Sequence, residues 1–82
     1  MRTRRNPIYK RILSEIENEV QIHPNYADLQ NQFALLLMFE GEMEKAESHF
    51  LEALRLNTKY REAILNLGFL FTEMRRWKEA EE

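Results

Sequence analysis

Apolar residues recur at every fourth position in the first part of the chain, a spacing that places them on one face of an α-helix. The positions are Ile8, Ile12, Ile16 and Val20. Asn6-Pro7 precedes them, and this pair favours a helix start because asparagine caps free amide groups and proline is tolerated at the first helical position. Pro24 disfavours helical backbone in His23 before it. We therefore predict a first helix that begins at Pro7 and ends at His23-Pro24.

The pattern of the remaining chain predicts further helices joined by very short turns. The second is expected from about Tyr26 to Glu40, the third from about Glu42 to Leu56 and the fourth from about Lys59 to Met74. Gly41 can end the second helix because glycine takes the left-handed backbone conformation without strain, and Asn57-Thr58 breaks the third. Arg75-Arg76 occupies the position of the next turn, so we expect a fifth helix to open at Trp77.

The pattern repeats every 34 residues, and we call the residue 34 positions later the counterpart. The counterparts of Phe33, Ala34, Leu37 and Met43 are Leu67, Gly68, Phe71 and Trp77. The match is in chemical type rather than identity. Such self-similarity is typical of stacked helix-turn-helix units, each of which buries its apolar face against its neighbours. The predicted fold is all-α, an α-solenoid fragment of about four antiparallel helices.

These residues resemble the tetratricopeptide repeat (TPR), whose units follow the pattern W-x2-L-G-x2-Y, then A-x3-F, then P. Phe33-Ala34-x2-Leu37 and Leu67-Gly68-x2-Phe71 occupy the L-G-x2-Y portion, and Ala46-x3-Phe50 occupies the A-x3-F portion. Gln30 and Ile64 replace the leading aromatic, and Thr58 replaces the proline. The resemblance implies that the small residues stand where helix backbones approach closely. These residues are Ala34, Gly68, Ala46 and Ala53.

The repeat divides the chain into a basic arm, residues 1–6, and a TPR-like helical domain, residues 7–82. The parts of the domain are residues 7–24, which resemble the second half of a repeat, residues 25–58, a full repeat, and residues 59–82, an incomplete one. In the first part, Ile12 stands where a small residue is usual and Ile16 where an aromatic is usual. An incomplete last repeat would leave the fourth helix without a partner, although terminal repeats normally need a polar cap.

The resemblance implies a protein-interaction scaffold, because TPR proteins hold peptides or protein segments in a concave groove lined by the first helix of each repeat. By this analogy we expect partner binding at Asn31, Leu35, Met38, Leu65, Asn66 and Phe69. The apolar residues would anchor a peptide or helix, and the two asparagines would hold its amides. No lysine or arginine lies among the groove positions, which argues against a ligand with an acidic C-terminal tail.

Three other interpretations stay open. The same aliphatic residues could complete core packing against the first helix, since aliphatic stripes at helical spacing are mostly core. A second copy could cover the unpaired fourth helix by stacking or by helix exchange, which would make a homo-oligomer. Nucleic acid is a less favoured partner in this chain of net charge −2. It is suggested by the basic residues Arg2, Arg4, Arg5 and Lys10, and by Arg75, Arg76 and Trp77 as a stacking platform. A short basic leader is more often a solvated terminus.

We expect no enzymatic activity, no metal site and no cofactor. The chain lacks cysteine, and its two histidines, His23 and His49, show no zinc-ligand spacing. Gly41 and Gly68 stand alone, so no glycine-rich phosphate loop is present. No apolar run is long enough to insert across a membrane, and none follows the basic arm to make a secretory signal. The compartment stays open, with the cytoplasm favoured.

Overall fold

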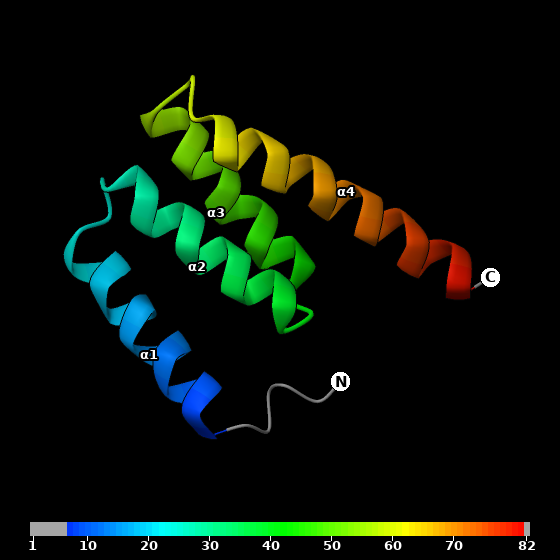
Figure 1. Ribbon diagram of the computed structural model, residues 1–82, viewed down its shortest axis with the longest axis horizontal. Coiled ribbons are helices and arrows are strands. Elements are labelled where there is room, and N and C mark those ends of the chain that lie inside the picture. Colours follow the sequence, from blue (N-terminus) through cyan, green and yellow to red (C-terminus); the bar gives the residue numbers. More distant parts are fainter. Residues whose placement is uncertain (1–6, 82) are drawn as a thin grey trace.

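The computed structural model describes residues 7–81, which form four α-helices and no strand (Figure 1). The helices are α1 (Pro7–Ile22), α2 (Ala27–Phe39), α3 (Met43–Leu56) and α4 (Arg61–Glu81). Each runs roughly antiparallel to the one before it, and α2 contacts all three others. The predicted all-α, repeat-like fold is confirmed in this part of the chain. Residues 1–6 and the side chain of Trp77, which supply part of the nucleic-acid interpretation, lie outside the described residues.

The two turns that lead into α2 and α4 have the same backbone hydrogen bond, one repeat apart. Tyr26 N–H donates to the His23 carbonyl at 3.2 Å, and Tyr60 N–H donates to the Asn57 carbonyl at 3.1 Å. The next helix begins one residue after the tyrosine in both cases. The 34-residue period therefore holds in the backbone as well as in the sequence.

Gly41 closes the turn between α2 and α3. Its φ is 88°, a left-handed conformation that glycine adopts without the steric penalty of other residues. Gly41 N–H donates to the Met38 carbonyl at 3.0 Å, and Glu42 N–H donates to the Leu37 carbonyl at 2.9 Å. These bonds satisfy carbonyls at the end of α2, so the chain can reverse at once and α3 can pack against α2.

The core is centred on α2 and α3 and includes residues of α1 and α4. Four alanines have no exposed surface, which allows the helices to approach closely: Ala34, Ala46, Ala53 and Ala63. Phe50 and Leu70 are the largest of the fully buried side chains. Apolar burial of this kind is the main source of stability in a small helical domain.

The turn predicted at Arg75-Arg76 is wrong, because α4 continues through both residues to Glu81. Arg75 is the counterpart of Gly41, and arginine has a high helix propensity and no ease of entering the left-handed conformation. Arg75 pairs with Glu79 at 3.2 Å and Arg76 pairs with Glu73 at 3.2 Å. Ion pairs at these spacings support a helix. Within the described residues, the segment expected to open a fifth helix instead extends α4.

Gly68 does not have the packing role that the resemblance implied. Its counterpart one repeat earlier, Ala34, is fully buried in the core. A Cβ atom at Gly68, by contrast, would meet no other atom within 4 Å. In the part of the chain that the structure describes, no helix therefore lies against this side of α4.

Candidate protein-binding surface

The six residues predicted to bind a partner lie in three different environments. Met38 and Asn31 are buried, Leu35 and Asn66 are half-buried, and Leu65 and Phe69 are exposed at 65% and 50%. Met38 is part of the core cluster, so it does not line an accessible groove as expected. The apolar side chains available to a partner are therefore those of Leu35, Leu65 and Phe69.

Asn31 and Asn66 bind each other across the contact between α2 and α4. Asn66 Nδ2 donates to Asn31 Oδ1 at 3.2 Å. Burial raises the pKa of the Tyr60 hydroxyl, and a side-chain hydrogen bond with Asn31 opposes that rise. The geometry thus gives Asn31 a structural role between helices, in place of the expected contact with the amides of a ligand.

A shallow apolar hollow lies between α1 and α2. It has a volume of about 260 Å³, and its lining residues are Ile12, Ile16, Gln32, Leu35 and Leu36. We call it the α1–α2 hollow. The site predicted from the sequence did not include Ile12 and Ile16, although comparison with their counterparts one repeat later could have identified them. The counterparts of these two residues are Ala46 and Phe50, which other helices cover completely.

A second apolar surface, which we call the open face of α4, consists of Ile64, Leu65, Gly68, Phe69 and Phe71. Its four apolar side chains are between 46% and 65% exposed. The opposite side of α4 supplies Ala63 and Leu70, both fully buried. Isolated exposed apolar residues are ordinary on protein surfaces, whereas contiguous groups of them are typical of interaction sites.

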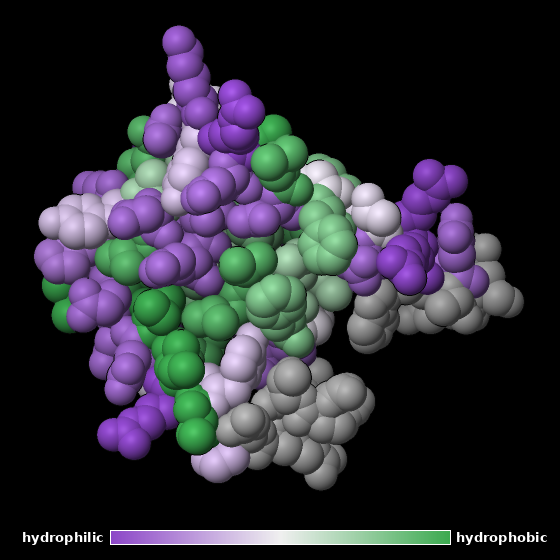
Figure 2. Space-filling model, in the orientation of Figure 1, coloured by the Kyte–Doolittle hydropathy of each residue, from purple (hydrophilic) through white to green (hydrophobic). Residues whose placement is uncertain are grey.

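Apolar side chains extend over α1 and α2 toward α4 on the face shown in Figure 2, with hydrophilic residues at its outer edges. The helices α2 and α4 run in the same direction and are joined by Asn31 and Asn66. Leu35 follows Asn31 by four residues and Phe69 follows Asn66 by three, so both stand about one helical turn beyond the hydrogen bond. Leu35, Leu65 and Phe69 together form what we call the apolar band.

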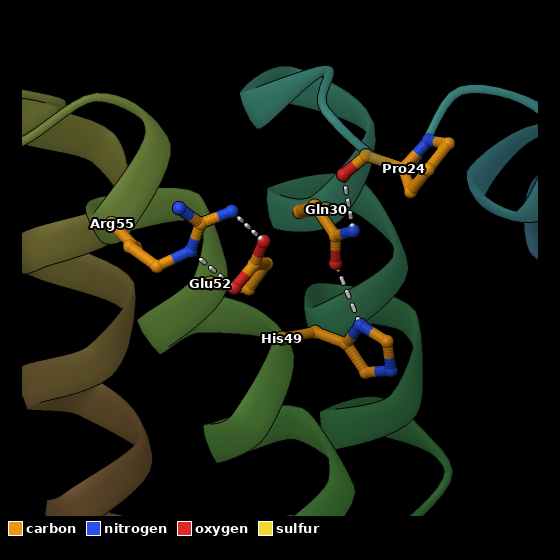
Figure 3. Close-up of polar contacts among 5 residues, drawn as sticks. All are labelled: Pro24, Gln30, His49, Glu52 and Arg55. Carbon is orange, nitrogen blue, oxygen red and sulfur yellow. Dashed lines mark hydrogen bonds and ion pairs between the residues drawn. The ribbon is translucent and has the colours of Figure 1, made fainter.

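A chain of hydrogen bonds holds His49 between α2 and α3 (Figure 3). Gln30 Nε2 donates to the Pro24 carbonyl at 2.9 Å, and Gln30 Oε1 lies 2.7 Å from His49 Nδ1. Because an amide oxygen only accepts, His49 Nδ1 carries the proton. The ring also meets Phe33 edge to face, with centroids 4.7 Å apart. The imidazole is therefore engaged in the packing of the two helices.

The polar groups near His49 are otherwise those of an ordinary helix surface. Glu52 and Arg55 form an exposed ion pair at 2.6 Å on α3 (Figure 3). A depression of about 470 Å³ beside the network has a mixed lining: Leu13, Glu17, Phe33, Leu37, Glu40, Glu42, Lys45, Ser48 and His49. Among the described residues, no group of three metal-ligating side chains could hold an ion. None of the helices there is long and apolar enough to cross a membrane.

We expect the stability of the fold to fall at acidic pH through His49. Burial lowers the pKa of His49, because the charged ring loses solvation, and the nearby Glu52 carboxylate opposes this. The unfolded chain therefore takes up this proton at a higher pH than the folded one. The contribution is complete above the ordinary histidine pKa of about 6.5 and is lost as the pH falls toward the lower folded-state value.

Urea unfolding at about pH 7.5 and about pH 5.5 measures this effect on either side of the ordinary pKa. The unfolding midpoint of the unaltered chain should be lower at the acidic pH. In His49→Gln the difference between the two midpoints should shrink. An equal drop in both proteins would assign the pH dependence to other groups.

Comparison with known proteins yielded no match, either to a model of a protein family or to a curated protein. The likeness to the TPR therefore rests on the residue pattern of positions 25–80. The fold adds a helix-turn-helix geometry that recurs at the same period and leaves apolar side chains exposed on α1, α2 and α4.

Proposed function

We propose that this chain is a TPR-like protein-interaction module that binds the apolar face of a peptide or helix along the apolar band. The observation that carries the proposal is the exposure of Leu65 and Phe69, which are 65% and 50% accessible. A domain this small buries a limited share of its apolar surface, and each large side chain left in water forgoes roughly 1.5–3 kcal/mol of burial. A partner that covers these side chains would recover part of that free energy.

The shape of the band favours a ligand with apolar anchors at helical spacing. Leu65 and Phe69 are four residues apart, so they stand on one face of α4. Leu35 stands on α2, which Asn31 and Asn66 join to α4. It lines the α1–α2 hollow, which offers a place for one apolar side chain of the ligand. An amphipathic helix laid into a groove presents anchors of this kind, and an aromatic such as Phe69 is a frequent centre of binding energy.

A peptide-display selection tests the proposal without knowledge of the natural partner. The 82-residue chain is used to select from a random-peptide library, and binding of the enriched peptides is then measured on variants. Phe69→Lys should weaken binding by at least about 30-fold, because loss of a central anchor costs about 2 kcal/mol or more. Leu51→Lys is the matched control, since Leu51 is 48% exposed on α3, away from the band.

Enriched peptides should carry apolar residues at three- or four-residue spacing, and Leu51→Lys should bind them as the unaltered chain does. Failure to enrich any peptide would contradict the proposal. So would peptides that bind Phe69→Lys as tightly as the unaltered chain. Circular dichroism of each variant would confirm that its helix content is retained.

The nucleic-acid alternative gains no support from the described residues. Arg75 and Arg76, two of its expected contacts, are paired with Glu79 and Glu73 on the same helix. The remaining contacts fall on Lys10, which is exposed on α1, on residues 1–6 and on the Trp77 side chain. Self-association is the stronger alternative, because Ile64 and Phe71 are exposed beside Gly68 on a face of α4 that nothing in the described chain covers.

A further inference from the structure

Among the described residues, the outer helices α1 and α4 each lack a neighbour that the equivalent inner helix has. The 34-residue register makes α1 equivalent to α3, since both end at counterpart residues, Ile22 and Leu56. It makes α4 equivalent to α2, since both begin at counterpart residues, Arg61 and Ala27. Inside the molecule, α3 covers α2. The helix that α4 lacks is therefore one like α3, and α1 is such a helix.

The residues at the contact between α2 and α3 show how deeply side chains are buried when two helices of the repeat pack together. Ala34 and Leu37 on α2, together with Ala46 and Phe50 on α3, belong to one core cluster and are at most 6% exposed. Their equivalents on the two end helices are much more accessible. Gly68 is exposed and Phe71 is 46% exposed on α4, and Ile12 is 44% exposed on α1.

The end helices complement each other in size. Where the inner pair has two alanines, Ala34 and Ala46, the end pair has Gly68 on α4 and Ile12 on α1. A residue without a side chain thus faces a larger one, and a Cβ at Gly68 would meet no atom within 4 Å, so there is room for the isoleucine. Cores tolerate such exchanges when the total volume is kept.

A second exchange between the inner and the end helices involves an aromatic residue. Leu37 and Phe50 of the inner pair are replaced by Phe71 on α4 and Ile16 on α1. Leu37 and Phe50 belong to one core cluster, and the two end helices together again supply one aromatic and one aliphatic side chain. Ile16 is half-buried against the core of its own chain, and Ile12 is the more accessible of the two isoleucines.

Charged residues at equivalent positions of the two end helices also complement each other. Ala27 and Ala53 of the inner pair correspond to Arg61 on α4 and Glu19 on α1, which carry opposite charges and are both exposed. An arginine and a glutamate at equivalent places across a contact favour one register and one orientation. Glu15, the equivalent of His49, is exposed and pairs with Arg11 of the same helix at 3.7 Å.

We propose that copies of this chain assemble head to tail, with α1 of one copy packed antiparallel on α4 of the next, against Ile64, Gly68 and Phe71. This contact repeats the α2–α3 contact and continues the 34-residue period from one chain into another. At the same junction, α4 fills the α1–α2 hollow of the next copy. A contact between two different faces is heterologous, so it leaves a free α1 at one end and a free α4 at the other and allows growth beyond two copies.

The assembly goes beyond peptide binding along the apolar band, and the two can be tested separately because they use different residues of α4. On α4 the assembly depends on Ile64, Gly68 and Phe71, whereas the band depends on Leu65 and Phe69. Phe69→Lys should therefore lose peptide binding and keep self-association. Phe71→Lys should lose self-association.

The test is the mass of the 82-residue chain in solution, measured by light scattering from micromolar to millimolar concentration. The mass should rise with concentration from the 10.0 kDa of one chain past that of two chains. Ile12→Lys and Phe71→Lys, each at a site about half exposed, should keep their helix content but remain single chains. Leu51→Lys, the same change at a similarly exposed site on α3, should associate as the unaltered chain does.

Mixing the two defective variants gives the sharpest result. Ile12→Lys keeps an intact α4 and Phe71→Lys keeps an intact α1, so an equimolar mixture can form one junction and no more. The mixture should reach the mass of two chains and stop there. Should Phe71→Lys lose helix content, Gly68→Leu replaces it, because position 68 has room for a side chain in the single molecule.

Three results would overturn the proposal. The first is a mass of one chain at every concentration. The second is association that Phe71→Lys abolishes and Ile12→Lys leaves intact, which would mean that α4 pairs with α4. The third is a mixture of the two folded variants that stays at one chain.

Discussion

Phe50→Ala is expected to destabilise the fold by about 3–5 kcal/mol, the cost of removing a buried aromatic ring and leaving a cavity. Phe50 on α3 is fully buried within the core cluster. The stability of small domains lies at the lower end of about 5–15 kcal/mol, so this loss would leave much of the chain unfolded at 25 °C. Urea or thermal unfolding followed by circular dichroism measures it.

The neighbouring residue provides the control for this substitution. Leu51 lies on the same helix and is 48% exposed, so Leu51→Ala should change the free energy of unfolding by roughly 0.5 kcal/mol, as is usual for surface sites. Similar unfolding midpoints for Phe50→Ala and Leu51→Ala would show that Phe50 is not at the centre of the core.

Leucine at two equivalent positions, Ala34 and Gly68, should have opposite effects on stability. At Ala34, which is fully buried, the larger side chain should cost about 1–3 kcal/mol because it overpacks the contact with α3. At Gly68 it meets open space and should stabilise α4 by about 0.5–1 kcal/mol, since glycine is a poor helix former.

Unfolding measured at micromolar concentration, where single chains prevail, would separate the two variants. Gly68→Ala is a useful companion, because it adds only the Cβ and should retain most of the gain in helix propensity. Destabilisation of Gly68→Leu to the same extent as Ala34→Leu would mean that a helix covers this side of α4 even in the single molecule.

Local features of the fold followed from the sequence because each depends on neighbouring residues. The turn at Gly41 was predictable, since a glycine ends an apolar helical pattern there and takes a φ of 88°. The turn predicted at Arg75-Arg76 was wrong because local residues again decided the backbone conformation. The repeat suggested a turn, but the residues themselves are strong helix formers paired with Glu79 and Glu73, and local propensity prevailed over the period of the repeat.

The candidate site was predicted less well, because burial depends on which helices lie alongside. Asn31 and Leu35 both stand on α2 at positions assigned to one groove. The structure uses Asn31 to bind Asn66 on α4 and leaves Leu35 in the α1–α2 hollow. Helical spacing placed these residues near one face of α2, but it does not specify how closely the neighbouring helix approaches that face.

The sequence by itself determined the first three helices, the period of the repeat and the apolar character of the surface between the helices, because spacing, caps and turn residues act over a few positions. Only the tertiary structure decided that Met38 is core, that Leu65 and Phe69 are exposed, and that Gly68 faces open space where Ala34 is covered. The physical reason is that the exposed fraction of a side chain depends on helices that are distant in sequence. Within the described residues, the same 34-residue pattern has a neighbour on both sides at α2 but not at α4.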